Sequence, residues 1–218
     1  PMNRTLKVLF FALIVRPFVL IGLGLNIVNR NGLPTSGPSV IAANHNSHLD
    51  TLVLMSLFPL AVLDRVRPVA AADYFLSNRF REWFSQSIIG IIPLDRTGGT
   101  DTEVLFETCR QALDRNEILI LFPEGTRGDP EHMSRVRKGI CHLLDDREQT
   151  PVIPVVMHGL GRALPRGEAL LVPFNCDVVI GNPMQIDGRS NEFVKQLTEN
   201  FNELFTHCLT RHEDDQDL

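Results

Sequence analysis

The chain has 218 residues, 44% of them hydrophobic and 22% charged, which is typical of one globular domain with a sizeable core. Its formal net charge of −5 argues against a nucleic-acid-binding protein, which usually carries a basic surface. The four cysteines lie far apart without a C-x-x-C pair, so we expect free, buried thiols rather than a zinc or redox motif.

The chain begins with a mostly apolar stretch, residues 6–28, that has Arg16 and Pro17 near its middle. A membrane-spanning helix needs about 20 apolar residues without a central charge, which counts against a span. A cleaved signal peptide needs a small-residue cleavage site, and no A-x-A pattern follows. We favour two short apolar helical pieces, kinked at Pro17, that lie in a membrane surface with Arg4 and Lys7 toward anionic headgroups.

The charge distribution supports this preference over the alternative of a buried core helix. Residues 1–49 contain four basic residues and no acidic one, as expected beside an anionic membrane. The last residues, 213–218, hold four acidic residues and no basic one, and we interpret them as a solvated tail. We therefore predict an apolar membrane-associating segment over residues 1–30, a catalytic domain over residues 31–212 and an acidic tail over residues 213–218.

Strands and helices alternate along the rest of the chain. Short apolar runs predict strands over residues 39–43, 68–72, 117–122, 152–157 and 177–180. The apolar residues 51–57 are predicted to begin a helix. Further helices are predicted over residues 78–89, 101–115, 137–147 and 191–209. Pro154 lacks an N–H, which suggests an edge strand or a bulge there. This alternation predicts an α/β fold: a single domain with a mostly parallel sheet flanked by helices.

Ligands of such folds gather where the strands end, and His45 and Asp50 follow the first predicted strand after residue 43. Ser47, three residues before Asp50, fits a helix N-terminal capping box. Residues five apart inside one helix point about 140° away from each other, at roughly 100° per residue. With Ser47 as the cap, His45 precedes the helix, so the imidazole and the Asp50 carboxylate can meet, one carboxylate oxygen serving the cap and the other the imidazole.

An aspartate behind a histidine fixes the tautomer of the imidazole and stabilises the imidazolium that forms when the other nitrogen takes a proton. This makes His45 a candidate general base. The spacing His45-x-x-His48-x-Asp50 also raises the hypothesis of a metal-dependent hydrolase, but no later cluster of His and Asp completes a metal shell. We therefore expect no metal site.

A second group of suggestive residues follows the strand predicted over residues 117–122. Gly125 permits a tight turn or a close approach to a ligand, and Arg127 offers a planar fork of donors suited to phosphate. Lys138 lies shortly downstream, and the segment from Gly90 to Arg96 delivers another arginine.

Taken together, these motifs resemble the glycerolipid and lysophospholipid acyltransferases, in order and at ordinary spacing. The segment from Asn44 to Asp50 resembles the catalytic His-x4-Asp block of that family, and residues 90–96 its second block. Residues 122–127 resemble the third block, and Ile153-Pro154-Val155 with Gly159 the fourth. The resemblance covers roughly residues 25–188 and most closely suggests a 1-acylglycerol-3-phosphate acyltransferase.

The resemblance implies an O-acyltransferase of phospholipid synthesis in which His45 is the base and Asp50 orients it. The donor would be an acyl-CoA or an acyl-carrier protein, and the acceptor lysophosphatidate. Glycerol 3-phosphate, another lysophospholipid or an aminolipid remain alternative acceptors. We expect no cofactor, no nucleic-acid partner and a membrane-associated protein on the cytoplasmic face of a bacterial inner membrane, peripheral or monotopic. The residues expected to bind or shape the site for the acceptor phosphate are Arg96, Glu124, Gly125, Thr126, Arg127 and Lys138.

Overall fold

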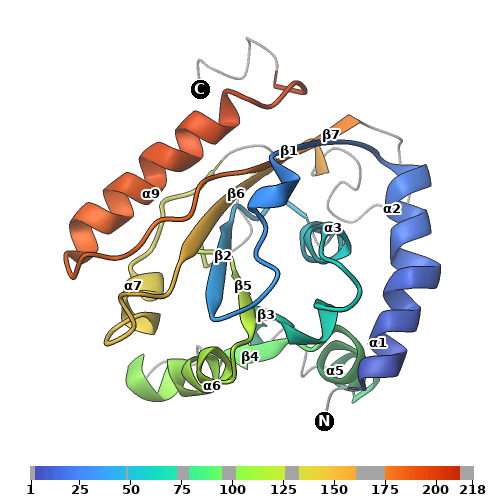
Figure 1. The fold of residues 1–218 in the computed structure, drawn as a ribbon, viewed down its shortest axis with the longest axis horizontal. Helices are drawn as coiled ribbons and strands as arrows, with labels where there is room; N and C mark the ends of the chain where they lie inside the picture. Colours follow the sequence, from blue (N-terminus) through green and yellow to red (C-terminus); the bar gives the residue numbers. More distant parts are fainter. Residues whose placement is uncertain are drawn as a thin grey trace.

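The computed structural model describes residues 3–47, 49–72, 79–94, 102–125, 133–160 and 175–211. Within these ranges the chain forms one seven-stranded sheet with helices on both faces (Figure 1). The strands are β1 (Gly24–Val28), β2 (Ser39–Ala43), β3 (Val66–Ala71), β4 (Ile92–Leu94), β5 (Ile118–Leu121), β6 (Val152–His158) and β7 (Asn175–Ile180). The α-helices are α1 (Arg4–Phe10), α2 (Arg16–Gly22), α3 (Leu49–Leu57), α5 (Arg79–Phe84), α6 (Thr102–Asp114), α7 (Gly139–Leu143) and α9 (Ser190–Phe205). Two π-helical turns, η1 (Phe11–Val15) and η4 (Ser85–Ile89), and two 3-10 turns, η2 (Arg30–Gly32) and η3 (Leu63–Arg65), complete the set.

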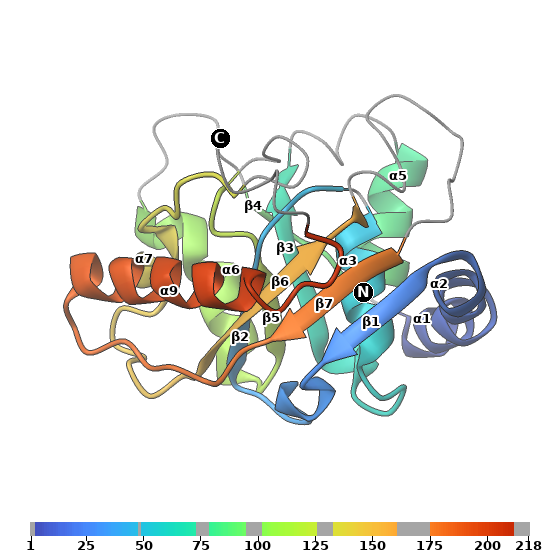
Figure 2. The same cartoon turned by 90° about the horizontal axis from the view of Figure 1, so that it is seen from above.

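The sheet has the strand order β1-β7-β6-β2-β5-β3-β4. Every neighbouring pair is parallel except β6 and β7, which confirms the predicted mostly parallel sheet between helices. Seen from above, the strands cross the middle of the molecule with helices on either side (Figure 2). Because β2 is parallel to both of its neighbours, β5 and β6, the carboxyl ends of these three strands share one edge of the sheet.

The core has one part on each face of the sheet, because side chains alternate along a strand. In β2, Val40 and Ala42 face the core under α6, α7 and α9, whereas Ile41 and Ala43 face the core under α3 and the N-terminal helices. Buried on both faces, these strands are continuous apolar runs, as parallel strands usually are. The buried stripe of α9 contains Phe193, Leu197, Phe201 and Leu204, and the four cysteines are free and buried, both as predicted.

Several predicted elements differ from the structure. Strand β4 was not predicted, and the helix predicted over residues 137–147 covers only Gly139–Leu143. Residues 24–28, placed in the second helical piece, form the edge strand β1 because they pair in parallel with β7, about 150 residues further on. Pro154 lies inside an internal strand rather than at an edge or a bulge. Its missing N–H is tolerated because β7 has ended beside it: Ile180 pairs with Val155, and the N–H of Gly181 donates to the Pro154 carbonyl at 2.8 Å.

The N-terminal segment is one helical run from Arg4 to Gly22 rather than two pieces kinked at Pro17. The irregular turn η1 ends two residues before Pro17, which lies in the first turn of α2 inside the continuous run. By length and composition alone this run could cross a membrane, a property that core helices and signal sequences share. One side of it packs against α3, as Figure 1 shows.

Lys7 is buried, contrary to the expectation that it faces lipid headgroups. It lies on the same stripe as Phe11, Val15 and Val19, four residues apart, and this stripe packs onto the domain. Its ammonium donates to the Val66 carbonyl at 2.7 Å. Arg4 is exposed and lies 3.3 Å from Asp64.

Burial lowers the pKa of Lys7 to about 7, and the charge of Arg67 acts in the same direction, while Asp64 and Glu117 raise it. The unfolded chain therefore holds more protons on Lys7 between about pH 7 and about pH 10.5, and the stability that Lys7 contributes rises with pH across this window. We expect the free energy of unfolding of the wild type to rise relative to that of Lys7→Met between about pH 7 and about pH 10. Urea unfolding of both proteins measures this, and a difference independent of pH would contradict it.

Helix α3 is held at its carboxyl end by two arginines from outside it. Arg16 donates to the carbonyls of Ser56 and Phe58, and Arg30 donates to that of Leu57. Cations at this end satisfy the free carbonyls and complement the helix dipole. The N-terminal helical run is therefore tied to the helix that carries Asp50 at its other end.

Candidate active site

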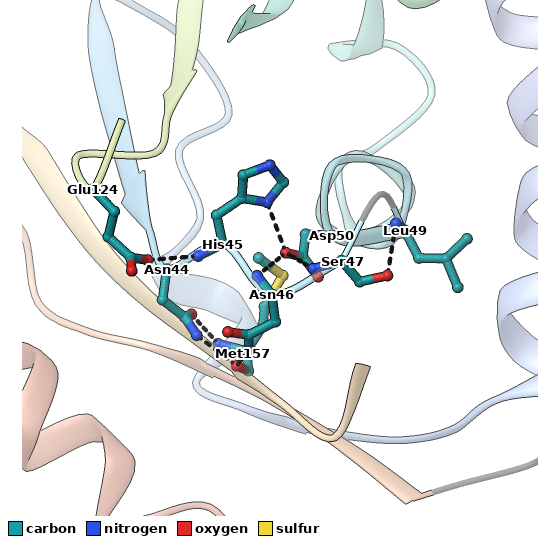
Figure 3. A network of polar contacts seen from close by, with 8 residues as sticks. All are labelled: Asn44, His45, Asn46, Ser47, Leu49, Asp50, Glu124 and Met157. Atoms are coloured by element: carbon teal, nitrogen blue, oxygen red, sulfur yellow. Dashed lines mark hydrogen bonds and ion pairs between the residues drawn. The ribbon is translucent and has the colours of Figure 1, made fainter. Parts of the chain in front are cut away.

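His45 and Glu124 follow neighbouring strands at the shared edge of the sheet, His45 after β2 and Glu124 after β5. Asn44 fixes the first of these loops. Its side-chain amide donates to the Met157 carbonyl at 2.8 Å and accepts from the Met157 N–H at 2.7 Å, so it continues the pairing of β2 with β6 (Figure 3). The Asn46 amide donates to the same carbonyl at 2.9 Å. Three consecutive residues after the strand are thus held in place, with His45 in the middle.

The His45 imidazole meets the Asp50 carboxylate, as the capping argument predicts. Nδ1 of His45 lies 2.9 Å from Oδ2 of Asp50, and Asp50 is fully buried (Figure 3). The Ser47 hydroxyl accepts from the Leu49 N–H at 3.3 Å, and the Ser47 N–H donates to Asp50 at 2.8 Å. Ser47 is therefore the cap, and the chain turns back at it so that His45 and Asp50 approach each other.

The two oxygens of the Asp50 carboxylate do not share the hydrogen bonds in the way predicted. Oδ2 alone accepts from Nδ1 of His45, from the Asn46 N–H at 2.6 Å and from the Ser47 N–H. Oδ1 is buried and has no donor among the described residues. The reason is geometric, because the turn before α3 presents its two N–H groups to the side from which the imidazole also approaches.

The orientation of the His45 ring leaves Nε2 as the reactive atom. The ring stacks on Phe122, with centroids 4.1 Å apart and planes 20° from parallel. An ionised Asp50 can only accept, so Nδ1 carries the proton and the Nε2 lone pair is available to a substrate. The side chain of His45 is 20% exposed, and its second ring nitrogen points away from Asp50 (Figure 3).

Glu124 is a clamp behind His45. It is buried, and Oε1 accepts from the His45 N–H at 2.8 Å while Oε2 accepts from the Ser134 N–H at 2.6 Å. Burial raises the pKa of its carboxyl, although the two N–H groups favour the charged form. Glu124 therefore joins the His45 loop to the segment that begins at residue 133, and its two oxygens are already engaged.

Replacing Glu124 with alanine should lower the free energy of unfolding by about 2 kcal/mol or more, because each hydrogen bond to a charged group contributes about 1.5–3 kcal/mol. We also expect a lower kcat, since the His45 backbone loses its anchor. Chemical denaturation and steady-state kinetics measure the two effects. Glu107→Ala on the exposed side of α6 is the control. Equal effects of the two variants would exclude the clamp.

The predicted residues of the third block fall partly within the described chain. Gly125 has a φ of +75°, and a Cβ there would lie 3.3 Å from the Arg137 side chain, so both the turn and the close approach favour glycine. Lys138 is exposed immediately before α7. Arg96, Thr126 and Arg127, together with the acidic tail, lie outside the described residues.

The metal hypothesis gains no support. Within the described ranges no three His, Cys, Asp or Glu side chains converge on a common point, and His48 lies outside them. The Nδ1 atom of His45 faces Asp50 in a hydrogen bond, which is the arrangement of an oriented base.

Sequence reasoning overlooked the part played by Asn46, Phe122 and Met157. The aromatic ring of Phe122 fixes the plane of the imidazole, and the Met157 backbone holds both asparagines. The only signal was the presence of an asparagine on each side of His45.

The chain was also compared with known proteins. A family model described as "Acyltransferase" matches residues 24–158. The mouse 1-acyl-sn-glycerol-3-phosphate acyltransferase alpha is 28% identical over 182 residues, which cover 83% of this chain and 61% of the relative. The chloroplastic 1-acyl-sn-glycerol-3-phosphate acyltransferase LPAT1 of Arabidopsis thaliana is 26% identical over 180 residues, 80% of this chain and 48% of the relative. The chain thus spans about half to three-fifths of the length of these relatives.

A solved structure with a similar fold was also found. It is the 1-acyl-sn-glycerophosphate (LPA) acyltransferase PlsC from Thermotoga maritima, with a TM-score of 0.73 and 17% sequence identity over 95% of this chain and 81% of that one. At this identity the likeness concerns the fold alone.

Proposed function

This chain belongs to the acyltransferase family, and we propose that it transfers a fatty acyl group from a thioester donor to the hydroxyl of lysophosphatidate in phospholipid synthesis. The observation that carries the proposal is the hydrogen bond between His45 and the buried Asp50, with Nε2 pointing away from Asp50 (Figure 3). The printed names of the mouse and plant relatives support the choice of acceptor.

His45 is the general base in this proposal. Nε2 takes the proton of the acceptor hydroxyl as its oxygen attacks the thioester carbonyl, and Asp50 stabilises the imidazolium that forms. The tetrahedral intermediate then collapses, the C–S bond breaks, and the imidazolium returns its proton to the departing thiolate. The transfer balances without a metal or a bound cofactor. Phe122 stacks on the ring and holds its plane.

The acceptor phosphate is assigned to the basic residues of the motifs. Arg96, Arg127 and Lys138 would bind it, with Gly125 and Thr126 shaping the turn around it. Glu124 would act on this site indirectly, because its two oxygens hold backbone N–H groups.

We propose further that the N-terminal helical run rests on a membrane, as a peripheral or monotopic attachment at its cytoplasmic face. The support is a row of exposed apolar side chains, among them Leu13, Leu20 and Ile21, which are 70%, 73% and 87% exposed. A surface of this kind is typical of membrane-binding helices.

Replacing Leu20 and Ile21 together with aspartate should reduce binding to anionic phospholipid vesicles by at least about tenfold, because burying each large apolar side chain contributes about 1.5–3 kcal/mol. Co-flotation with vesicles measures this. Val104→Asp, at an apolar position on α6 that is 66% exposed, should bind as the wild type does. Unchanged flotation of the double variant would refute the assignment of this surface.

The identity of the acceptor is tested by analysing the products that the enzyme forms with different acceptors. Purified protein in mild detergent is mixed with a long-chain acyl-CoA and, in parallel, with lysophosphatidate, glycerol 3-phosphate, a lysophospholipid with a larger headgroup or an aminolipid. We expect phosphatidate from lysophosphatidate as the major product. A faster reaction with another acceptor would overturn the substrate, and repeating the panel with an acyl-carrier protein identifies the donor.

A further inference from the structure

A groove with a volume of about 660 Å³ lies beside the candidate active site. One wall comes from residues 134–138 and the other from the first turns of α9, with Asn191 and Lys195. Glu124 also lines the groove, and its carboxylate accepts from the His45 N–H and from the Ser134 N–H. The groove therefore begins one side chain away from the proposed base. Its volume is that of a small-molecule site.

The groove is strongly basic. Arg135, Arg137, Lys138 and Lys195 line it and are exposed, and Glu124 is the acidic residue among the described residues of its wall. The charge of Glu124 is directed at two backbone N–H groups. Lys195 has an exposed partner in Glu199 at 3.9 Å, a contact worth little in water.

The remaining three cations of the groove, Arg135, Arg137 and Lys138, have no carboxylate partner in the described part of the chain. Clustered like charges repel one another, and a multivalent anion removes that cost. The chemistry of the wall thus indicates a ligand that carries several negative charges.

The groove also has an apolar floor. Val136 is buried and Val194 is half-buried, and both line it between the cations. The proposed acceptor, lysophosphatidate, has a single phosphate with a charge of about −1.5 to −2, which is too little to neutralise four cations. The free end of coenzyme A has an adenine ring and three phosphate groups, with about four negative charges at neutral pH, since a phosphate monoester carries about −1.5 to −2.

We propose that this groove binds the phosphorylated nucleotide of a coenzyme A thioester, so that its pantetheine arm runs past Glu124 and delivers the thioester to His45. This inference rests on the proposed function and makes coenzyme A, rather than a carrier protein, the form of the donor. Arg135, Arg137 and Lys195 bind the phosphates of the nucleotide, Val136 and Val194 contact the adenine, and Lys138, at the end of the segment, is kept for the acceptor phosphate.

Calorimetric titration of free coenzyme A into the full chain in mild detergent tests the proposal without turnover. The double variant Arg135→Gln with Lys195→Gln should weaken binding by at least about tenfold, because each charge-assisted hydrogen bond contributes about 1.5–3 kcal/mol. Arg65→Gln, an exposed arginine in η3 on another part of the chain, removes a charge of the same sign and should change the Kd less than about twofold. Thermal unfolding of each variant checks that it is folded.

Two further titrations test which phosphate-bearing ligand the groove binds. Dephospho-coenzyme A, which lacks the 3′-phosphate, should bind the wild type more weakly than coenzyme A, and saturating glycerol 3-phosphate should leave coenzyme A binding unchanged. Displacement by glycerol 3-phosphate would reassign the groove to the acceptor. No binding of coenzyme A, or equal binding by the double variant, would overturn the proposal. Binding is measured apart from catalysis, so a negative result here leaves acyl transfer standing, and absent turnover leaves the binding result standing.

Discussion

Replacing His45 with alanine is expected to lower kcat for acyl transfer by about 10²–10⁴-fold, the usual contribution of a general base. The acceptor hydroxyl loses the only positioned group that the described chain offers for its proton, Nε2 beside the stacked Phe122. The change should appear in kcat rather than in KM, because the imidazole acts on the reacting atoms and not on the phosphate. Steady-state kinetics with both substrates varied give the two parameters.

His207→Ala is the matched control for this prediction, since His207 is exposed after α9. Its kcat should equal that of the wild type. A loss confined to the KM of either substrate in His45→Ala would indicate a binding role for the histidine, and unchanged kinetics would remove it from the mechanism.

Replacing Asp50 with asparagine is expected to lower kcat by about 10⁴-fold, by analogy with the aspartate of serine-protease triads. The asparagine amide can donate to Nδ1, and it then holds the tautomer whose Nε2 bears the proton and cannot act as a base. Stability should fall as well, by about 1–3 kcal/mol, because Oδ2 accepts three hydrogen bonds in a buried place. Kinetics and urea unfolding of the same preparation measure the two effects.

Ser47→Ala separates the structural part of this effect from the chemical part. It removes the cap of the Leu49 N–H and should lower stability by about 1 kcal/mol while changing kcat far less than Asp50→Asn does. Similar losses of kcat in the two variants would show that the loop conformation, and not the tautomer, accounts for the role of Asp50.

The sequence predicted the parts of the fold that local patterns determine. Strand β2 was predicted at its observed bounds, and α9 was recognised by a stripe from Phe193 to Leu204 that is buried. Strand β1 was missed because its five residues acquire strand character only by pairing with β7, about 150 residues away. Lys7 was misplaced for a similar reason, since the surface on which its stripe packs is built by α3 and β3 much later in the chain.

The candidate site shows the same limit. The contact between His45 and Asp50 could be predicted because both residues belong to one turn, and because the sequence identifies Ser47 as the helix cap in that turn. The clamp by Glu124 and the stacking of Phe122 could not, because they depend on β5 lying beside β2. The predicted phosphate ligands Arg96 and Arg127 lie outside the described residues, and their role stays a prediction.

The most direct test of acyl transfer is the release of free thiol from a long-chain acyl-CoA by the purified wild type in mild detergent, with and without lysophosphatidate. We expect rapid release only when lysophosphatidate is present, in amounts equal to the phosphatidate formed. Equal release without lysophosphatidate would show that water is the acceptor and that the protein is a thioesterase, which would contradict the proposed transfer.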